Sequence, residues 1–168
     1  MVKDLFVFSC FTGLSYSVMK GLRNSNIQDF FDGNQWIILR RKKTATSSNV
    51  MLLDIPKMII KKYAGLSKDG KVFPVPSNTI CNDSLKRISQ QIDCLKEKKV
   101  TFHLARHTFA TLFLSEGVPL ESLSKMLGHK NIAITQIYAK ILNEKVGKDM
   151  QKVSHEFKGL EQSFISQF

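Results

Sequence analysis

The stretch that decides the fold is HLARHTFATLFLSEGVPLESLSKMLGHKNIAITQIYAKI, residues 103–141. Its apolar residues recur at close to helical spacing, and breaks at Gly117, Pro119 and Gly128 interrupt the pattern. Thr101 lies just before the stretch and has a side chain that can cap a helix N-terminus. The pattern predicts three consecutive helices, over residues 101–116, 120–127 and 133–141.

Polar residues at the start of the first of these helices form a pattern that suits an anion. His103 and Arg106 are three residues apart, so both side chains leave one face of the helix. The amides and dipole of a helix N-terminus attract anions, and an arginine fork binds two phosphate oxygens. A His-x-x-Arg pair also arises by chance in many helices. The pair therefore predicts a phosphate site only together with the residues around it.

Upstream of this stretch the hydrophobic period changes. Residues 35–43 and 49–53 are rich in β-forming residues and flank a polar turn, which predicts a hairpin. Pro74 and Pro76 make segment 72–77 extended and at most an edge strand. Further helices are predicted over residues 4–11, 16–22, 57–64, 77–96 and 143–158. The expected fold class is mostly α with a small antiparallel β-sheet (α+β).

The chain is strongly basic, with 25 Lys and Arg against 14 Asp and Glu and a formal net charge of +11. This surplus predicts an anionic partner, with nucleic acid favoured over a membrane because the basic residues are spread along the chain. No apolar run approaches the roughly 20 residues that span a bilayer. Cys10, Cys81 and Cys94 lack metal-ligand spacing, so neither a structural zinc site nor a disulfide framework is expected.

The order of His103, Arg106, a Gly-His turn at His129 and then Tyr138 resembles the catalytic domain of the tyrosine recombinase (phage integrase) family. The resemblance covers roughly residues 4–150. Within the family, the sequence is similar to integrases of conjugative or mobilizable transposons. It implies a site-specific recombinase for integration and excision of a mobile element, acting through a 3′-phosphotyrosyl intermediate. No metal or other cofactor is implied. Expected partners are double-stranded DNA and further copies of the chain in a synaptic tetramer, in the bacterial cytoplasm at the nucleoid.

The resemblance also implies roles for individual residues. Tyr138 is expected to be the nucleophile, and Arg106, His103 and His129 are expected to hold the scissile phosphate. His107 matches a histidine of the family that is expected to be structural. Without the resemblance, Tyr138 is interpreted as a core aromatic on an isoleucine-rich helix, and His129 as a helix-capping residue.

Basic residues on the predicted hairpin supply further candidates. Lys43 resembles the family's general acid, which protonates the departing 5′-hydroxyl, and Lys42 is the alternative. Arg40, Lys42 and Lys130 are expected to contact DNA. A hairpin that merely touches backbone phosphates is the competing interpretation.

The chain departs from the family at Ser15. The family has an arginine at this point, after Thr-Gly-Leu, and that arginine bonds the transferring phosphate; here the sequence is Thr-Gly-Leu-Ser. Loss of one such donor typically costs about 2.7–4 kcal/mol. Arg41 shares a strand face with Lys43, because alternate residues of a strand point the same way. We therefore expect Arg41 to act as a surrogate for the missing arginine.

Two other functions compete with a recombinase. A type IB topoisomerase shares the site but relaxes supercoils by rejoining the same strand. A non-catalytic DNA-binding remnant is the second alternative, and Ser15 is its best support.

The expected domain organisation is a single catalytic domain over residues 1–168, without the core-binding and arm-binding domains that precede it in the family. Residues 143–168 carry an apolar stripe and are expected to form a helical tail. The tail either packs on its own domain or docks on a neighbouring protomer.

Overall fold

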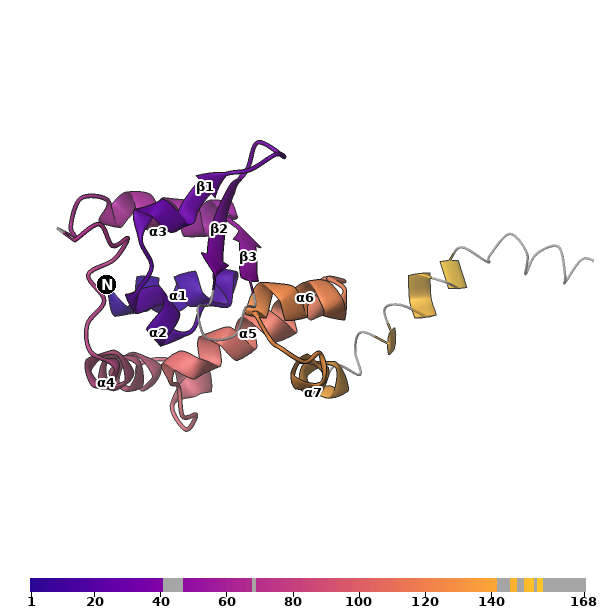
Figure 1. The fold of residues 1–168 in the computed structure, drawn as a ribbon. Coiled ribbons are helices and arrows are strands. Elements are labelled where there is room, and N and C mark those ends of the chain that lie inside the picture. Colours follow the sequence, from indigo (N-terminus) through magenta and orange to yellow (C-terminus); the bar gives the residue numbers. More distant parts are fainter. Residues whose placement is uncertain (41–46, 68, 142–145, 148–149, 153, 156–168) are drawn as a thin grey trace, which may run out of the picture.

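The computed structural model describes residues 1–40, 47–67, 69–141, 146–147, 150–152 and 154–155. The helices are α1 (Val2–Thr12), α2 (Tyr16–Lys20), α3 (Asp54–Tyr63), α4 (Asn78–Ser89), α5 (Phe102–Ser115), α6 (Leu120–Leu127) and α7 (Ala133–Ile141), with 3-10 turns η1 (Asn24–Asn26) and η2 (Asp93–Leu95). The strands are β1 (Ile27–Asp29), β2 (Gln35–Arg40) and β3 (Ser47–Met51). The predicted class, mostly α with a small antiparallel sheet, is confirmed (Figure 1).

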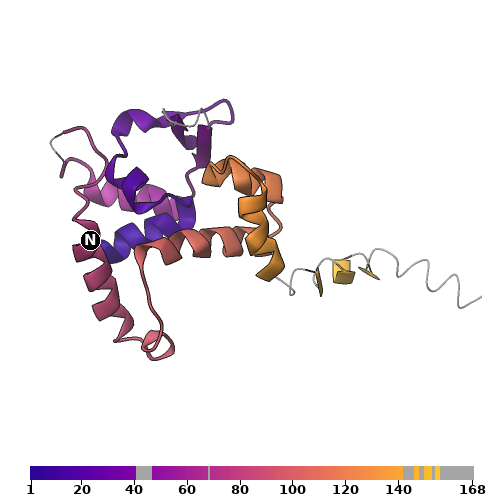
Figure 2. The same ribbon diagram turned by 60° about the horizontal axis from the view of Figure 1, so that its bottom comes forward.

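Helix α1 is central, because α3, α4 and α5 all pack against it (Figure 1). Leu5 and Phe8 are completely buried there, in an apolar cluster that also takes in Phe102 from the start of α5. A second apolar cluster lies where α5, α6 and α7 meet, and it includes Phe109 and Tyr138. Helix α5 therefore runs from one cluster to the other, and its middle lies at the boundary between them (Figure 2).

Gly13 brings the end of α1 close to α5. Its φ of 67° lies in the left-handed region, and its N–H closes α1 on the Ser9 carbonyl. A Cβ at this position would lie 2.6 Å from the Phe109 ring, so a side chain has no room. The loop that leads to Ser15 is thereby held against the middle of α5.

The antiparallel sheet has the order β1-β2-β3, with Ile37 paired to Ile27 on one side and to Val50 on the other. The predicted hairpin of β2 and β3 is confirmed for its described part, and it packs on α6 through a hydrogen bond from the Ser48 hydroxyl to the Met126 carbonyl. Strand β1 was not predicted, because three residues are too few to show an alternating pattern.

Two details of the predicted helices are wrong. The helix expected over residues 77–96 ends as α4 at Ser89, whose hydroxyl bonds the Lys86 carbonyl; farther on, Ile92 is 41% exposed, so it lacks the core contact that would extend the helix. Thr101 makes no capping hydrogen bond with its side chain. The Phe102 N–H instead donates to Oδ1 of Asn82 on α4, at 2.9 Å. The cap of α5 thus comes from a neighbouring helix.

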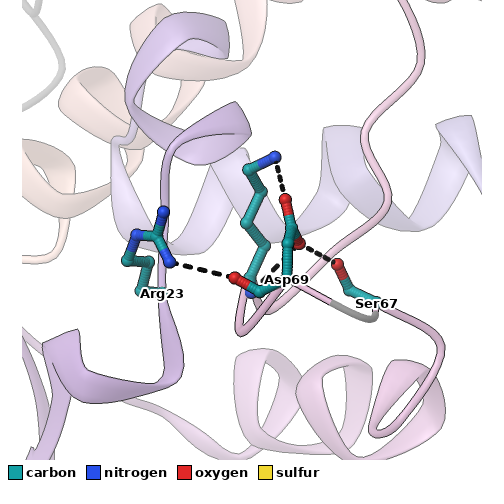
Figure 3. A network of polar contacts seen from close by, with 4 residues as sticks. Arg23, Ser67 and Asp69 are labelled. Atoms are coloured by element: carbon teal, nitrogen blue, oxygen red, sulfur yellow. Dashed lines mark hydrogen bonds and ion pairs between the residues drawn. The ribbon is translucent and has the colours of Figure 1, made fainter.

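A polar network joins the loop after α3 to the segment before β1. Arg23 donates to the Asp69 carbonyl at 2.9 Å, while the Asp69 carboxylate accepts from Ser67 at 2.7 Å and pairs with Lys71 (Figure 3). The Lys71 hydrogen bond, followed by that of Ser67, holds the pKa of Asp69 well below its usual range. These contacts join two segments that are far apart in the sequence, but because they are exposed they stabilise the fold only weakly.

Candidate active site

Arg106 lies at the centre of the candidate site, on α5, and is only 9% exposed. Its guanidinium donates from Nη1 to the Gly13 carbonyl and from Nη2 to the Leu127 carbonyl, each at 2.7 Å. One side chain therefore joins α5 to the end of α1 and the end of α6. An arginine remains charged and carries only donors, so these carbonyls stabilise a charge that burial would otherwise disfavour.

His129 stands beside Arg106 because Gly128 ends α6 in the left-handed conformation, with φ 64°. The His129 N–H then bonds back to the Ser124 carbonyl at 3.1 Å, which fixes the turn. In the ring, Nε2 lies 3.0 Å from Nη2 of Arg106, and Nδ1 lies 2.8 Å from the hydroxyl of Thr135 on α7. The imidazole thus bridges the guanidinium and the next helix.

Tyr138 lies on α7 and is 4% exposed in the second apolar cluster. Its ring centroid is 5.5 Å from that of His107, which is in turn 4.3 Å from that of the exposed His103. The interpretation of Tyr138 as a core aromatic therefore holds for this structure as well. Helices α5, α6 and α7 lie side by side (Figure 2). Arg106 and His107 come from α5, His129 from the turn after α6 and Tyr138 from α7, and these residues are joined by the His129–Arg106 and Tyr138–His107 contacts.

Burial and nearby positive charge shift the pKa values of Tyr138 and His107. Burial raises the pKa of Tyr138, and the positive charge of Arg106 opposes that effect. Burial, followed by the positive charges of His103 and Arg106, lowers the pKa of His107. A neutral phenol is a poor nucleophile, so any attack by Tyr138 needs a proton acceptor when the phosphate is in place.

Ser15 borders a cavity of about 370 Å³ next to His103. It is the N-cap residue of α2, and its hydroxyl lies 3.2 Å from that of Ser17. The cavity is lined by Ser15, Tyr16, Ser17, Asn78, Asn82, Thr101, Phe102 and His103. Ser15, where the family that the sequence resembles has an arginine, therefore lines the same cavity as His103.

The remaining predicted residues lie on the hairpin, directly after His129 and in the C-terminal tail, and the structure describes only some of them. Arg41, Lys42 and Lys43 lie outside the described residues. Arg40 ends β2 opposite Ser47, which brings the strand to the hairpin turn. Lys130 is exposed, directly after His129. Of the tail over 143–168, the structure describes only the short pieces given above, so its docking stays a prediction.

Thr135 was not predicted from the sequence. It is completely buried, three residues before Tyr138, and it holds the Nδ1 side of His129. A threonine inside an isoleucine-rich helix is a buried polar residue that needs a partner, and that was the only available signal. The sequence could not identify the partner.

Within the described ranges, no group of three or more His, Cys, Asp or Glu side chains could hold a metal ion. Over the same ranges, no helix has the length and apolar character to cross a membrane.

A model of the family described as "Phage integrase family" matches residues 3–145 of the chain. The chain is 32% identical over 117 residues to tyrosine recombinase XerA of Saccharolobus solfataricus, an alignment that covers 69% of this chain and 38% of that protein. It is 41% identical over 68 residues to tyrosine recombinase XerA of Thermococcus kodakarensis, covering 40% and 23%. The chain therefore spans well under half the length of these curated relatives.

Solved structures share the fold. The crystal structure of XerA recombinase matches with a TM-score of 0.69 and 20% identity, over 90% of this chain and 62% of that chain. The Tn1549 transposon integrase in complex with a circular intermediate DNA matches with a TM-score of 0.66 and 20% identity, over 89% and 57%. The family match over residues 3–145, in a chain with this fold, establishes that the chain belongs to the phage integrase family.

Proposed function

We propose that this chain is the catalytic domain of a site-specific DNA recombinase that cleaves and rejoins DNA strands through a 3′-phosphotyrosyl intermediate. The observation that carries the proposal is the junction of Arg106, His129 and Tyr138, which three separate segments bring to one place. The family match and the relatives named as tyrosine recombinases support it. They do not favour a topoisomerase.

Arg106 is the phosphate-binding residue in this proposal. Its two backbone carbonyl partners are neutral, whereas phosphate oxygens are charged and fit the guanidinium fork. The scissile phosphate therefore competes for these donors when DNA binds. His103, exposed one helical turn earlier, adds a second contact or assists proton transfer.

The cleavage step is a transesterification, in which one phosphorus–oxygen bond is exchanged for another. Tyr138 loses its proton to a base, its phenolate oxygen bonds phosphorus, and the bond from phosphorus to the 5′-oxygen breaks. Lys43 gives a proton to the departing 5′-oxygen. Attack by a 5′-hydroxyl reverses the step and releases Tyr138. Because the phosphodiester energy is retained in the protein–DNA bond, the reaction needs no nucleotide cofactor.

The substrate in this proposal is double-stranded DNA. The net charge of +11 supports an anionic partner. Among the structures with this fold, XerH is bound to its difH substrate and the Tn1549 integrase to a circular intermediate DNA. We further propose that Arg40, Lys42 and Lys130 contact the DNA. Copies of the chain would assemble on it as a synaptic tetramer, in the bacterial cytoplasm at the nucleoid, to integrate and excise a mobile element.

Arg41 remains our proposed surrogate for the arginine missing at Ser15. The cavity between Ser15 and His103 supports this idea, because it leaves room for a guanidinium from elsewhere. If Arg41→Ala cleaves DNA as fast as the parent while Arg106→Ala does not cleave, the surrogate is not Arg41.

The decisive experiment uses a nicked suicide DNA substrate that traps the covalent intermediate. We expect a denaturation-resistant protein–DNA adduct at the 3′ side of the break, absent in Tyr138→Phe, which keeps the buried ring. DNA binding without an adduct in the parent protein would instead support the non-catalytic remnant. Relaxation of supercoiled DNA without strand exchange would support a topoisomerase.

A further inference from the structure

We propose that Thr135 is a positioning residue, whose hydroxyl oxygen accepts the Nδ1 proton of His129 and thereby holds the imidazole against Arg106. The hydrogen bonds that carry this inference do not depend on any reaction, but the catalytic consequence rests on the function proposed above.

The Nε2 side of the His129 ring faces Arg106. Nη2 of Arg106 lies 3.0 Å from Nε2 of His129. A guanidinium has five N–H donors and no acceptor, and it is not deprotonated in proteins. Nε2 must therefore be the acceptor, with its lone pair toward Arg106. A proton on Nε2 would point at the hydrogens of a cation.

The Nδ1 side of the ring faces Thr135. A neutral imidazole carries one proton, and since Nε2 has none, Nδ1 carries it. The Thr135 hydroxyl oxygen, 2.8 Å from Nδ1, is then the acceptor. Thr135 is completely buried, so water does not replace it. Removal of this oxygen would take from the part-buried Nδ1–H the acceptor that Thr135 provides, and the loss of such a hydrogen bond costs free energy.

Thr135 also links the His129 ring to the helix that carries Tyr138. Thr135 lies in the first turn of α7, where its N–H bonds the Ile132 carbonyl at 2.8 Å and Asn131 caps the Ala133 N–H at 2.9 Å. The same helix carries Tyr138 one turn later. A chain of hydrogen bonds thus runs from the nucleophile's helix, through His129, to the guanidinium on α5. His129 serves here as an acceptor that orients Arg106, before any contact with phosphate.

The test compares Thr135→Val, which keeps the shape and removes the oxygen, with Thr135→Ser, which keeps the oxygen. Nitrogen NMR of the labelled imidazoles of the whole protein reports which ring nitrogen carries the proton. We expect a protonated Nδ1 and a bare Nε2 on His129 in the parent and in Thr135→Ser, and in Thr135→Val a shifted or lost Nδ1–H signal, because that proton loses the acceptor that Thr135 provides. Thr111→Val is the matched control, because among the described residues its hydroxyl bonds only the backbone carbonyls of His107 and Thr108.

Cleavage of the suicide substrate gives the second readout. In Thr135→Val we expect the cleavage rate at saturating DNA to fall about tenfold, the lower end of the loss that follows when the partner orienting a metal-bound histidine is removed, because no metal ion adds to the effect here. The DNA concentration for half-maximal rate should change less than about twofold, because Thr135 makes no contact with DNA in this scheme. Thr135→Ser should recover the rate, and Thr111→Val should keep it.

Distinct results overturn the two proposals. A parent protein with its proton on Nε2 of His129 refutes the positioning role, and so does a Thr135→Val protein whose ring pattern and rate both match the parent. That first measurement needs no variant, so it stands even if Thr135→Val fails to fold. If the ring pattern is as expected but Tyr138 forms no adduct, the positioning role holds and the recombinase function fails.

Discussion

The two halves of the candidate phosphate site differ in how completely the protein assembles them. Around Arg106 the neighbouring segments are joined by hydrogen bonds. The guanidinium bonds the carbonyls of Gly13 and Leu127 and contacts His129, and it is almost fully buried. Around His103 the structure is open, with an exposed imidazole beside the cavity that Ser15 borders. In the proposed function, one half of the site is therefore assembled before DNA binds, and the other half remains open to be completed.

Replacement of Arg106 should have the largest effect, because it removes the assembled half. We expect Arg106→Ala to slow cleavage by about 10²- to 10³-fold, the usual consequence of losing one well-placed donor to a transferring group. Arg106→Lys should also fail, since a single ammonium cannot reproduce the planar fork. Single-turnover cleavage of the suicide substrate measures both. A rate within about twofold of the parent would remove Arg106 from the chemistry.

Gly13→Ala disturbs the Arg106 half of the site through the backbone. The added Cβ meets the Phe109 ring at 2.6 Å and sits on a residue with φ 67°. We expect a loss of about 3 kcal/mol in the free energy of unfolding, from backbone strain and overpacking together. Urea denaturation measures it.

The matched control is Gly33→Ala, at a similar φ of 71° but with nothing within 4 Å of the new Cβ. It should cost only about 1 kcal/mol, from the backbone alone. Equal losses in the two variants would mean that the loop before Ser15 is not pressed against α5.

Ser15→Arg sharpens the comparison from the other side, because it fills the open half. The new guanidinium would enter the cavity next to His103, and we expect cleavage to become about tenfold faster, less than the full contribution of an ideally placed donor. Ser17→Arg, which places the same charge on another wall of that cavity, is the control. Equal gains from both would indicate a general attraction for DNA, detectable as equal changes in DNA affinity.

Asn82→Ala should have the smallest effect. Among the described residues, Asn82 supplies the cap of the Phe102 N–H, and loss of a cap typically costs about 1 kcal/mol in unfolding free energy. Asn78→Ala, one turn earlier on α4 and on the same cavity, removes only the long 3.5 Å contact with the Asn82 amide and keeps the Asn82 oxygen that caps α5. It should change stability by less than about 0.5 kcal/mol. Thermal melting of both variants makes the comparison. If Asn82→Ala melts like Asn78→Ala, α5 does not depend on α4 for its start.

Much of the architecture could be predicted from the sequence because its causes are local. The spacing of apolar residues and the breaks at Gly117, Pro119 and Gly128 predicted α5, α6 and α7 correctly, to within a residue or two. The order of His103, Arg106, His129 and Tyr138 indicated the family, which the match over residues 3–145 confirms. Their individual roles, and those of Lys43 and Arg41, remain predictions.

What failed or was missed depends on residues far apart in the chain. Thr101 was expected to cap α5, but Asn82 does so across a helix contact. Thr135 could not be linked to His129, and the carbonyls of Gly13 and Leu127 could not be recognised as partners of Arg106. Periodicity within the chain carries no information on such pairs.

The sequence by itself therefore determined the helical order, the basic character and the residue types able to bind and attack a phosphate. Only the tertiary structure decided which groups meet: the Gly13 loop presses on Phe109, Arg106 lies between two apolar clusters, and His129 reaches Thr135. The physical reason is that helix formation follows from neighbours a turn apart, whereas hydrogen bonds to a buried charge depend on the packing of whole helices.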